Sequence, residues 1–312
     1  MFDSNLQGIR ETGGTLARQQ ELSARVARLT PLDGNHQSVL PPLSLTRCSA
    51  PTVRMPTIYQ PCLAIVVQGR KRAVLNDEVF HYDALNYLVV SVTLPGMGQV
   101  LEATPEHPFL CLRLNLDLEE IARLVLELGD RGPSPAAADR GLFVARMDEP
   151  LLDAVLRMVK LLETPEDIAV LAPVIQREIY YRMLRGELGY RMVDAAQSES
   201  GNYRVVRAIE WLKQHYAAPL RIEDLADAVH MSPSALHHRF KAVTAMSPLQ
   251  YQKHLRLHEA RRLMFSAGIE SATAAHRVGY ESASQFSREY RRLFGAPPRS
   301  EIARLRETGV PA

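Results

Sequence analysis

The chain has 312 residues, with 46% hydrophobic and 6% aromatic side chains and a formal net charge of +2. This length favours two domains over one small core, and no stretch approaches the roughly 18 consecutive apolar residues of a membrane span. The N-terminus lacks a signal-peptide pattern, and Cys48, Cys62 and Cys111 have no C-x-x-C spacing, which argues against a disulfide framework or a zinc ribbon. We therefore expect a cytoplasmic protein without a membrane partner.

The N-terminal half begins with a predicted helix over residues 15–30 and continues with a β-rich region between Pro42 and Leu116. This region contains short apolar runs separated by turn residues: LSLTRC, CLAIVVQG, RAVLND, NYLVVSV, GQVLEA and FLCLRLNL. Such runs are typical of strands in a compact antiparallel barrel or sandwich.

Three helices are predicted after these strands. Asp117 is placed to cap the first, with Glu120 completing a capping box and Gly129 ending the helix. The other two cover residues 150–163 and 171–188. The apolar side of the last helix consists of Leu171, Val174, Ile175, Ile179 and Met183. This side predicts a contact with the core or, as the alternative, a dimer interface.

The small, polar segment AAQSESGN at residues 195–202 is predicted to contain a linker between two domains, which we place at residues 197–202. Residues 1–202 contain 20 basic and 25 acidic side chains, whereas the chain from Tyr203 onward contains 17 Lys and Arg against 10 Asp and Glu. The second half also holds seven of the ten histidines. This asymmetry favours a polyanionic partner for the second half.

Residues 203–306 show no strand pattern and predict six or seven helices, followed by a tail at residues 307–312. The central helix is expected to begin at Ser247 and Pro248, which suit the cap and the first position of a helix, and to extend to about Ser266.

The stretch MSPSALHHRFK predicts a helix capped by Ser232, with Pro233 at its first position. The expected buried side consists of Leu236, Phe240 and Val243. The opposite side is polar and consists of Ser234, His237, His238 and Lys241. Because RIEDLADAVH upstream predicts a second amphipathic helix, residues 222–244 have the plan of a helix-turn-helix motif.

The same plan recurs about 50 residues later, at residues 271–294. SATAAHRVG predicts a helix ended by Gly279, and YESASQFSREYRRLFG predicts one that buries Phe286, Tyr290 and Leu293. Its outward side chains have the same offsets as in the first motif: Ser284, Ser287, Arg288 and Arg291. Two such motifs predict recognition helices that enter successive major grooves about 34 Å apart. A helical bundle with solvated polar faces is the alternative.

The outward side chains suit DNA because Arg can pair with guanine bidentately, and Ser, Gln or His can reach base edges or phosphates. Flanking cations would hold the protein on phosphate without distinguishing sequences. The predicted phosphate contacts are Arg239, Lys241, Lys253, Arg291 and Arg292.

The stretch LRIEDLADAVHMSPSALHHRFKAVTAMSPLQYQKHLRLHEARRLM, continued by AAHRVGYESASQFSREYRRLFGAPP, resembles the AraC/XylS family of bacterial transcription regulators. The resemblance covers about residues 203–302, and PCLAIVVQG through LCLRLNLDLEE is more loosely similar to the cupin-like N-terminal domain of one subgroup. The base contacts that it implies are Ser234, His237, His238, Ser284, Gln285, Ser287 and Arg288. The family commonly has Arg in place of His238, so pH-sensitive binding by the first helix is a hypothesis. His276 is a second departure, to which we attach no function.

The resemblance implies an α+β protein with a cupin-like β-barrel and helical appendages at residues 1–196 and an all-α DNA-binding domain at residues 203–306. It further implies an activator that binds double-stranded promoter DNA, helps to recruit RNA polymerase, responds to a small organic effector in the barrel and forms a homodimer through its N-terminal half. No cofactor is implied.

Two other functions are the alternatives. A metal-dependent cupin-type enzyme would need an H-x-H cluster, but the β-region offers His81 and His107, and neither has a histidine two residues away. We therefore predict no metal site and no enzymatic activity. The second alternative is an effector-independent architectural DNA binder. Cys62 and Cys111 lie in apolar runs and are expected to be buried thiols, with thiol sensing as the alternative.

Overall fold

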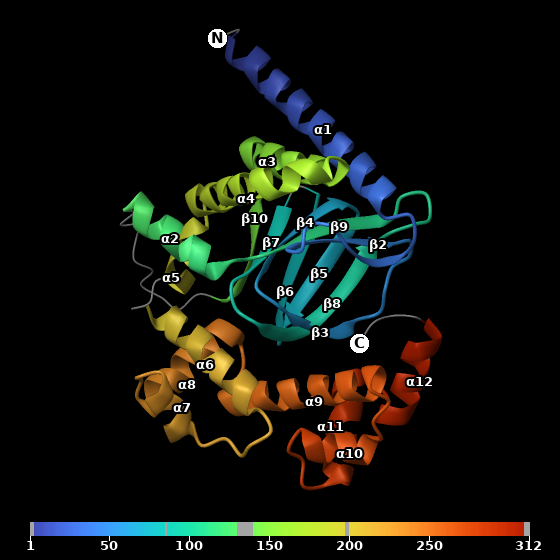
Figure 1. Ribbon diagram of the computed structural model, residues 1–312, viewed down its shortest axis with the longest axis vertical. Helices are drawn as coiled ribbons and strands as arrows, with labels where there is room; N and C mark the ends of the chain where they lie inside the picture. Colours follow the sequence, from blue (N-terminus) through green and yellow to red (C-terminus); the bar gives the residue numbers. More distant parts are fainter. Residues whose placement is uncertain (1–2, 85, 130–139, 197–199, 309–312) are drawn as a thin grey trace.

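The computed structural model describes residues 3–84, 86–129, 140–196 and 200–308, so the predicted linker and tail lie partly outside the described residues. Two antiparallel sheets with flanking helices precede a bundle of helices (Figure 1). The α+β class expected from the sequence is confirmed. The exact boundaries of the domains stay a prediction.

The two sheets face each other and form what we call the barrel. One sheet has the strand order β1-β2-β9-β4-β7-β10 and the other the order β3-β8-β5-β6, with antiparallel neighbours throughout. The strands are β1 (Gly34–Gln37), β2 (Leu43–Cys48), β3 (Met55–Tyr59), β4 (Cys62–Gln68), β5 (Arg70–Leu75), β6 (Glu78–Asp83), β7 (Asn86–Val90), β8 (Leu94–Glu102), β9 (Phe109–Asn115) and β10 (Leu142–Arg146).

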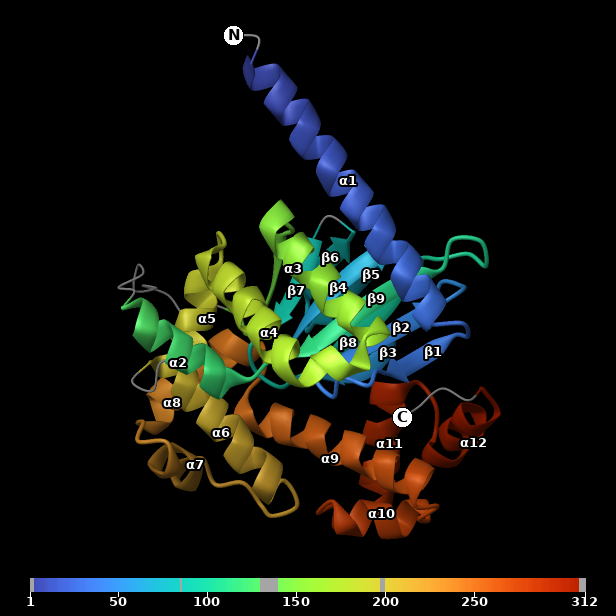
Figure 2. The ribbon, with the colours of Figure 1, turned by 45° about the horizontal axis from the view of Figure 1, so that its top comes forward.

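Helices cover the outer face of the six-stranded sheet, where α1, α3 and α4 lie against it (Figure 2). The helices of the N-terminal half are α1 (Asp3–Leu29), α2 (Leu118–Leu128), α3 (Glu149–Lys160), α4 (Ile168–Arg185) and α5 (Gly189–Ala196). Two 3₁₀ turns, η1 (Leu161–Glu163) and η2 (Pro165–Asp167), connect α3 to α4.

Alternate residues of β4 belong to different cores, because successive side chains of a strand point to opposite faces. Leu63 and Ile65 pack outward against α3 and α4, whereas Cys62, Ala64 and Val66 point to the inside of the barrel. Burial on both faces explains why this strand is a continuous apolar run in the sequence.

Helix α2 begins at the predicted cap. The Asp117 side chain accepts two backbone N–H groups, and Gly129 ends the helix with a left-handed φ of 58°. The predicted capping box is wrong: the N–H of Asp117 donates to the Tyr180 hydroxyl at 3.0 Å, and the Glu120 carboxylate pairs with Arg177 instead. The Asp117 N–H and the Glu120 carboxylate therefore each interact with α4, far away in the sequence, rather than with each other.

Seven helices follow in the described part of the second half: α6 (Gly201–His215), α7 (Ile222–Ala228), α8 (Pro233–Thr244), α9 (Pro248–Ser266), α10 (Ser271–Arg277), α11 (Ala283–Phe294) and α12 (Pro298–Thr308). Helix α9 has the predicted bounds, with Ser247 and Gln250 in a capping box. It lies between the two motifs, with α8 near one end and α11 near the other (Figure 1).

Two cores hold these helices. One contains Leu236, Phe240 and Val243 of α8 and Tyr251 of α9, and it continues into the inside of the barrel. The other lies between α9, α10, α11 and α12.

Candidate nucleic-acid interface

The first motif consists of α7 and α8, joined by a tight turn. His230 adopts a left-handed φ of 53° in this turn. The Ser232 hydroxyl then accepts the N–H of Ala235 at 3.2 Å, and Pro233 occupies the first turn of α8. The predicted helix start is therefore observed.

The outward side of α8 is polar and accessible. Its exposed side chains are Ser234, His237, His238 and Lys241, while the buried stripe is the predicted Leu236, Phe240 and Val243. The four exposed side chains line one shallow hollow together with Arg140, which comes from the N-terminal half. The three side chains of this motif that are expected to contact bases, Ser234, His237 and His238, are thus brought together on one surface.

The second motif consists of α10 and α11. Gly279 adopts a φ of +89° in the turn, and a Cβ at this position would lie 2.0 Å from the carbonyl oxygen of Ala217. Glycine is therefore required here for both its conformation and its size. The Ser282 hydroxyl accepts the N–H of Gln285 and caps α11.

The outward side of α11 matches that of α8. Ser284, Gln285 and Arg288 are exposed, while Ser287 is half-buried. The Gln285 amide donates to the Glu289 carboxylate at 3.2 Å, so this side chain already has one partner. Phe286 and Tyr290 are fully buried, and Leu293 of the predicted stripe is half-buried.

The predicted phosphate contacts fall into two groups. Lys241, Arg291 and Arg292 are exposed and form no ion pair with another described residue. Two others are engaged inside the protein: Arg239 lies 3.6 Å from the Asp194 carboxylate, and Lys253 lies 3.3 Å from that of Glu289. These two side chains would have to leave their partners to reach DNA.

Helix α9 braces the second motif through buried polar groups. Arg261 pairs with Glu301 at 2.8 Å, and the Tyr290 hydroxyl donates to the same carboxylate at 2.8 Å. His258 stacks edge-on against Phe294, and burial lowers its pKa to about 3, so the ring is neutral. A neutral histidine in this position acts as part of the core.

A contact between the two halves was not anticipated from the sequence. The Tyr251 hydroxyl donates to the carbonyl oxygen of Thr93 at 2.7 Å, and the N–H of Gly141 donates to the carbonyl oxygen of Val243 at 3.0 Å. Arg140 donates to the carbonyl oxygens at the end of α8, at 3.0 Å for Lys241, and pairs with Glu78 of β6. No local pattern around Arg140 signals this role.

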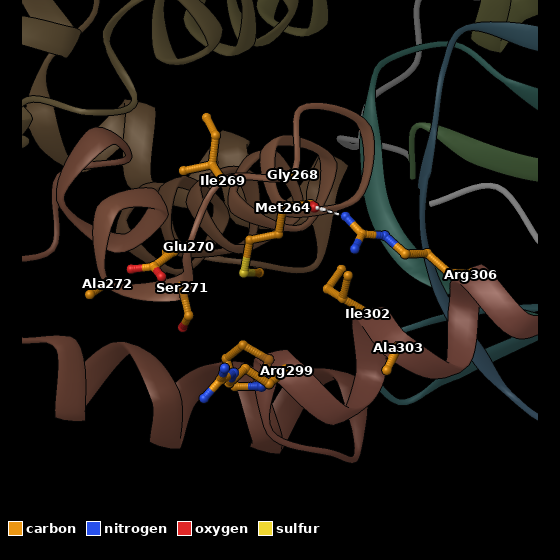
Figure 3. A pocket seen from close by; sticks show the side chains of 11 residues that line it. Met264, Gly268, Ile269, Glu270, Ser271, Ala272, Arg299, Ile302, Ala303 and Arg306 are labelled. Atoms are coloured by element: carbon orange, nitrogen blue, oxygen red, sulfur yellow. Dashed lines mark hydrogen bonds between the residues drawn. The ribbon is translucent and has the colours of Figure 1, made fainter.

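A second hollow lies between the end of α9, the start of α10 and α12 (Figure 3). The Arg306 guanidinium donates to the carbonyl oxygen of Met264 at its edge, at 3.0 Å. None of the predicted base-contacting residues lines this hollow, so it is separate from the candidate DNA surface.

The described part of the chain contains no group of three or more His, Cys, Asp or Glu side chains placed to hold a metal ion. Within the same residues, no helix is both long and apolar enough to cross a bilayer. Cys62 and Cys111 are buried and unpaired, and burial raises their pKa values to about 12 and about 11, which favours the unreactive thiol.

Comparison with known protein families identifies the family of this chain. A model of the N-terminus of AraC-type transcriptional regulators matches residues 39–191, and a model of a helix-turn-helix domain matches residues 225–304. The chain belongs to the AraC family of transcriptional regulators. The family resemblance of the sequence is confirmed.

Curated relatives agree with this assignment. The chain is 30% identical over 165 residues to the HTH-type transcriptional activator RhaS of Escherichia fergusonii, which is 53% of this chain and 59% of the relative. It is also 30% identical over 156 residues to RhaS of Citrobacter koseri, 49% of this chain and 55% of the relative. The chain thus spans little more than half the length of these relatives.

Solved structures share the fold at low sequence identity. The unsaturated fatty acid-bound structure of wild-type ToxT from Vibrio cholerae has a TM-score of 0.56 and 11% identity, over 90% of this chain and 100% of that one. ToxT bound to (E)-4-(8-methylnaphthalen-1-yl)but-3-enoic acid has a TM-score of 0.55 and 10% identity, over 83% and 98%. These structures confirm the arrangement of a β-rich half followed by a helical half.

Proposed function

We propose that this protein is a sequence-specific transcription activator whose binding to promoter DNA is controlled by a small organic effector in the barrel. The observation that carries the proposal is the single buried core that joins the inside of the barrel to the first helix-turn-helix motif. A ligand that alters the barrel therefore has a direct route to a DNA recognition helix.

Helices α8 and α11 are the proposed recognition helices. Their exposed polar faces present donors and acceptors to base edges, and the exposed guanidinium of Arg288 suits bidentate pairing with guanine. Lys241, Arg291 and Arg292 lie beside these faces and are available for phosphate. In this scheme α9 holds the two helices at a fixed separation.

The effector would act by shifting the protein between two arrangements of its halves. The docked arrangement is held by the hydrogen bond from Tyr251 to Thr93, by that from Gly141 to Val243 and by Arg140 at the end of α8. A ligand with different affinity for the docked and released arrangements would change how α8 is presented to DNA.

The relatives support the activating and sensing parts of the proposal. RhaS is an activator by name, and we extend activation through RNA polymerase to this chain. ToxT has been solved with a fatty acid bound, which supports a small organic effector here. The proposed homodimer would use the N-terminal half, where α4 leaves Val170, Leu171 and Val174 exposed at 72%, 43% and 64%. Ile175, Ile179 and Met183 of the same helix are core residues.

The proposal is tested by selecting double-stranded DNA from a random pool with the full chain and footprinting the recovered site. We expect a defined sequence with two protected major-groove segments about 34 Å, or one helical turn, apart. Recovery of unrelated sequences would overturn sequence-specific binding. Affinity for the selected site would then be measured with and without small organic compounds, and no response to any of them would support an effector-independent DNA binder.

A further inference from the structure

The inside of the barrel carries two positive charges at positions that its strands direct inward. On β5, Lys71 and Ala73 point to one side of the strand, whereas Arg72 and Val74 point to the other. Since Ala73 lies in the inner core, Lys71 is directed inward as well. Arg113 of β9 shares its side with Cys111, which lies in the same core. Both charged side chains are half-buried, so they are partly shielded yet remain within reach of a small molecule.

Neither charge has an acidic partner within the part of the chain that the structure describes. Among the described residues, Lys71 and Arg113 form no hydrogen bond or ion pair, and the Nε atom of Arg113 is buried without a partner. The acidic side chains at the ends of the neighbouring strands are already paired, Glu78 with Arg140 and Glu102 with Arg70. Half-burying two cations without an anion costs free energy, which a bound anion would recover.

The two cations surround the same part of the interior. Phe109, Cys111 and Arg113 share the inner side of β9, and Lys71 approaches the same strand at Phe109, so both cations border this inner face. Both also oppose the burial that raises the pKa values of the Cys62 and Cys111 thiols. The Lys71 ammonium lies 5.8 Å from the ring centre of Phe109. A Cβ at Gly98 of β8 would lie 3.1 Å from the Tyr59 hydroxyl oxygen and 3.6 Å from the Cε of Lys71, so these two side chains meet beside this glycine.

The inner core that contains the charges is mainly apolar, with Tyr82 opposite Lys71 and Tyr59 beside it. Inward side chains of the same core include Leu88, Val90 and Val100, and Phe109 lies beside the ammonium. A fully hydrated dianion would gain little from such walls, whereas a monoanion with an apolar body would bury that body against them. The planar fork of an Arg side chain matches a carboxylate in particular.

We infer that Lys71 and Arg113 bind the carboxylate group of an organic acid whose apolar part packs against the inner walls of the barrel. This inference rests on the proposed effector-controlled function and names the chemical class of the effector. Arg113 donates in-plane hydrogen bonds to the carboxylate, and Lys71 supplies a second, more mobile charge.

The test uses the full chain and matched pairs of compounds: octanoate, decanoate, phenylacetate and 1-naphthylacetate, each beside its primary amide. Calorimetry should show at least one acid binding at least tenfold more tightly than its amide. Arg113→Gln and Lys71→Gln should each weaken that acid at least tenfold. The matched control is Arg54→Gln, which removes an exposed charge from the same half and should leave binding unchanged.

A second readout needs no ligand. Since the two charges are unpaired in the free protein, Arg113→Gln and Lys71→Gln should raise its melting temperature, while Arg54→Gln should not. If one variant fails to fold, the other and the conservative Arg113→Lys, which keeps the charge but not the fork, still test the site.

The outcomes separate the inference from the function beneath it. Equal binding of an acid and its amide, or binding by amides alone, would overturn the carboxylate site. If such a compound still changed the affinity for DNA, control by an effector would nevertheless be supported. No binding by any acid overturns the inference. If in addition no compound of either series changes DNA affinity, effector control falls as well.

Discussion

The two helix-turn-helix motifs have the same plan but different neighbours. Phe240 of α8 lies in a core that continues into the barrel, whereas Phe286 of α11 lies in a core built by α9 to α12. Helix α11 passes close to β3, yet within the described residues that second core contains no barrel side chain. The repeated sequence plan therefore does not give the two motifs equal roles.

The difference extends to the polar contacts. The first motif is tied to the N-terminal half by Tyr251 and Arg140. The second is tied to α12 by the buried group of Arg261, Tyr290 and Glu301. We expect the effector to act on the first motif while the second remains a fixed anchor on DNA.

The largest expected effect comes from opening each core in turn. Phe240→Ala and Phe286→Ala should each lower the free energy of unfolding by about 3–5 kcal/mol, because both rings are fully buried. The two variants should differ in which parts of the protein lose stability. Phe240→Ala should speed amide hydrogen exchange in β7 as well as in α8, whereas Phe286→Ala should leave β7 protected.

Denaturant unfolding gives the size of each effect, and exchange followed by mass spectrometry gives its location. If Phe240→Ala left the exchange of β7 amides unchanged, the shared core would not couple the two halves, and the contrast between the motifs would fail.

The second effect concerns DNA. Arg288→Ala should weaken binding to the selected site by roughly 1–3 kcal/mol and relax the preference at one base pair, because the bidentate pairing with guanine is lost. Arg299→Ala is the matched control, since Arg299 is exposed on α12 and lines the separate hollow of Figure 3. Equal affinity and an unchanged footprint for Arg288→Ala would exclude α11 as a recognition helix in the proposed orientation.

Much of the helical half was predictable because its signals are local. Ser232 and Ser247 with their following prolines gave the starts of α8 and α9, and the spacing of apolar residues gave their buried sides. Gly279 marked a turn in which a Cβ would clash with Ala217. In the equivalent turn of the first motif, His230 adopts a positive φ. The sequence does not predict this conformation, because glycine is the usual residue at positive φ.

The missed features depend on partners far away in the chain. Strands β1, β3, β6 and β10 were not predicted, and in β1, β3 and β6 most side chains are half-buried or exposed rather than forming an apolar run. Arg239 was expected on phosphate, but Asp194 lies beside it only because α5 packs near α8. The role of Arg140 follows from a contact about a hundred positions away. Periodicity carries no information about such pairs.

The smallest effect tests the contact between the halves directly. The Tyr251 hydroxyl is buried, and burial raises its pKa, so it stays a protonated donor to the Thr93 carbonyl oxygen. Tyr251→Phe removes this donor without changing the ring and should cost about 1 kcal/mol of docking free energy. An amide protected by docking should then exchange about fivefold faster, since 1.4 kcal/mol corresponds to a factor of ten.

The informative amide is that of Gly141, whose N–H donates across the same contact to Val243. The amide of Gly279, in the second motif, should exchange at its original rate. Tyr181→Phe is the matched control, because Tyr181 is 40% exposed on α4, away from the contact. If Gly141 and Gly279 accelerated together, Tyr251 would support the whole helical half rather than the docking of its first motif, and the two motifs would open as one unit.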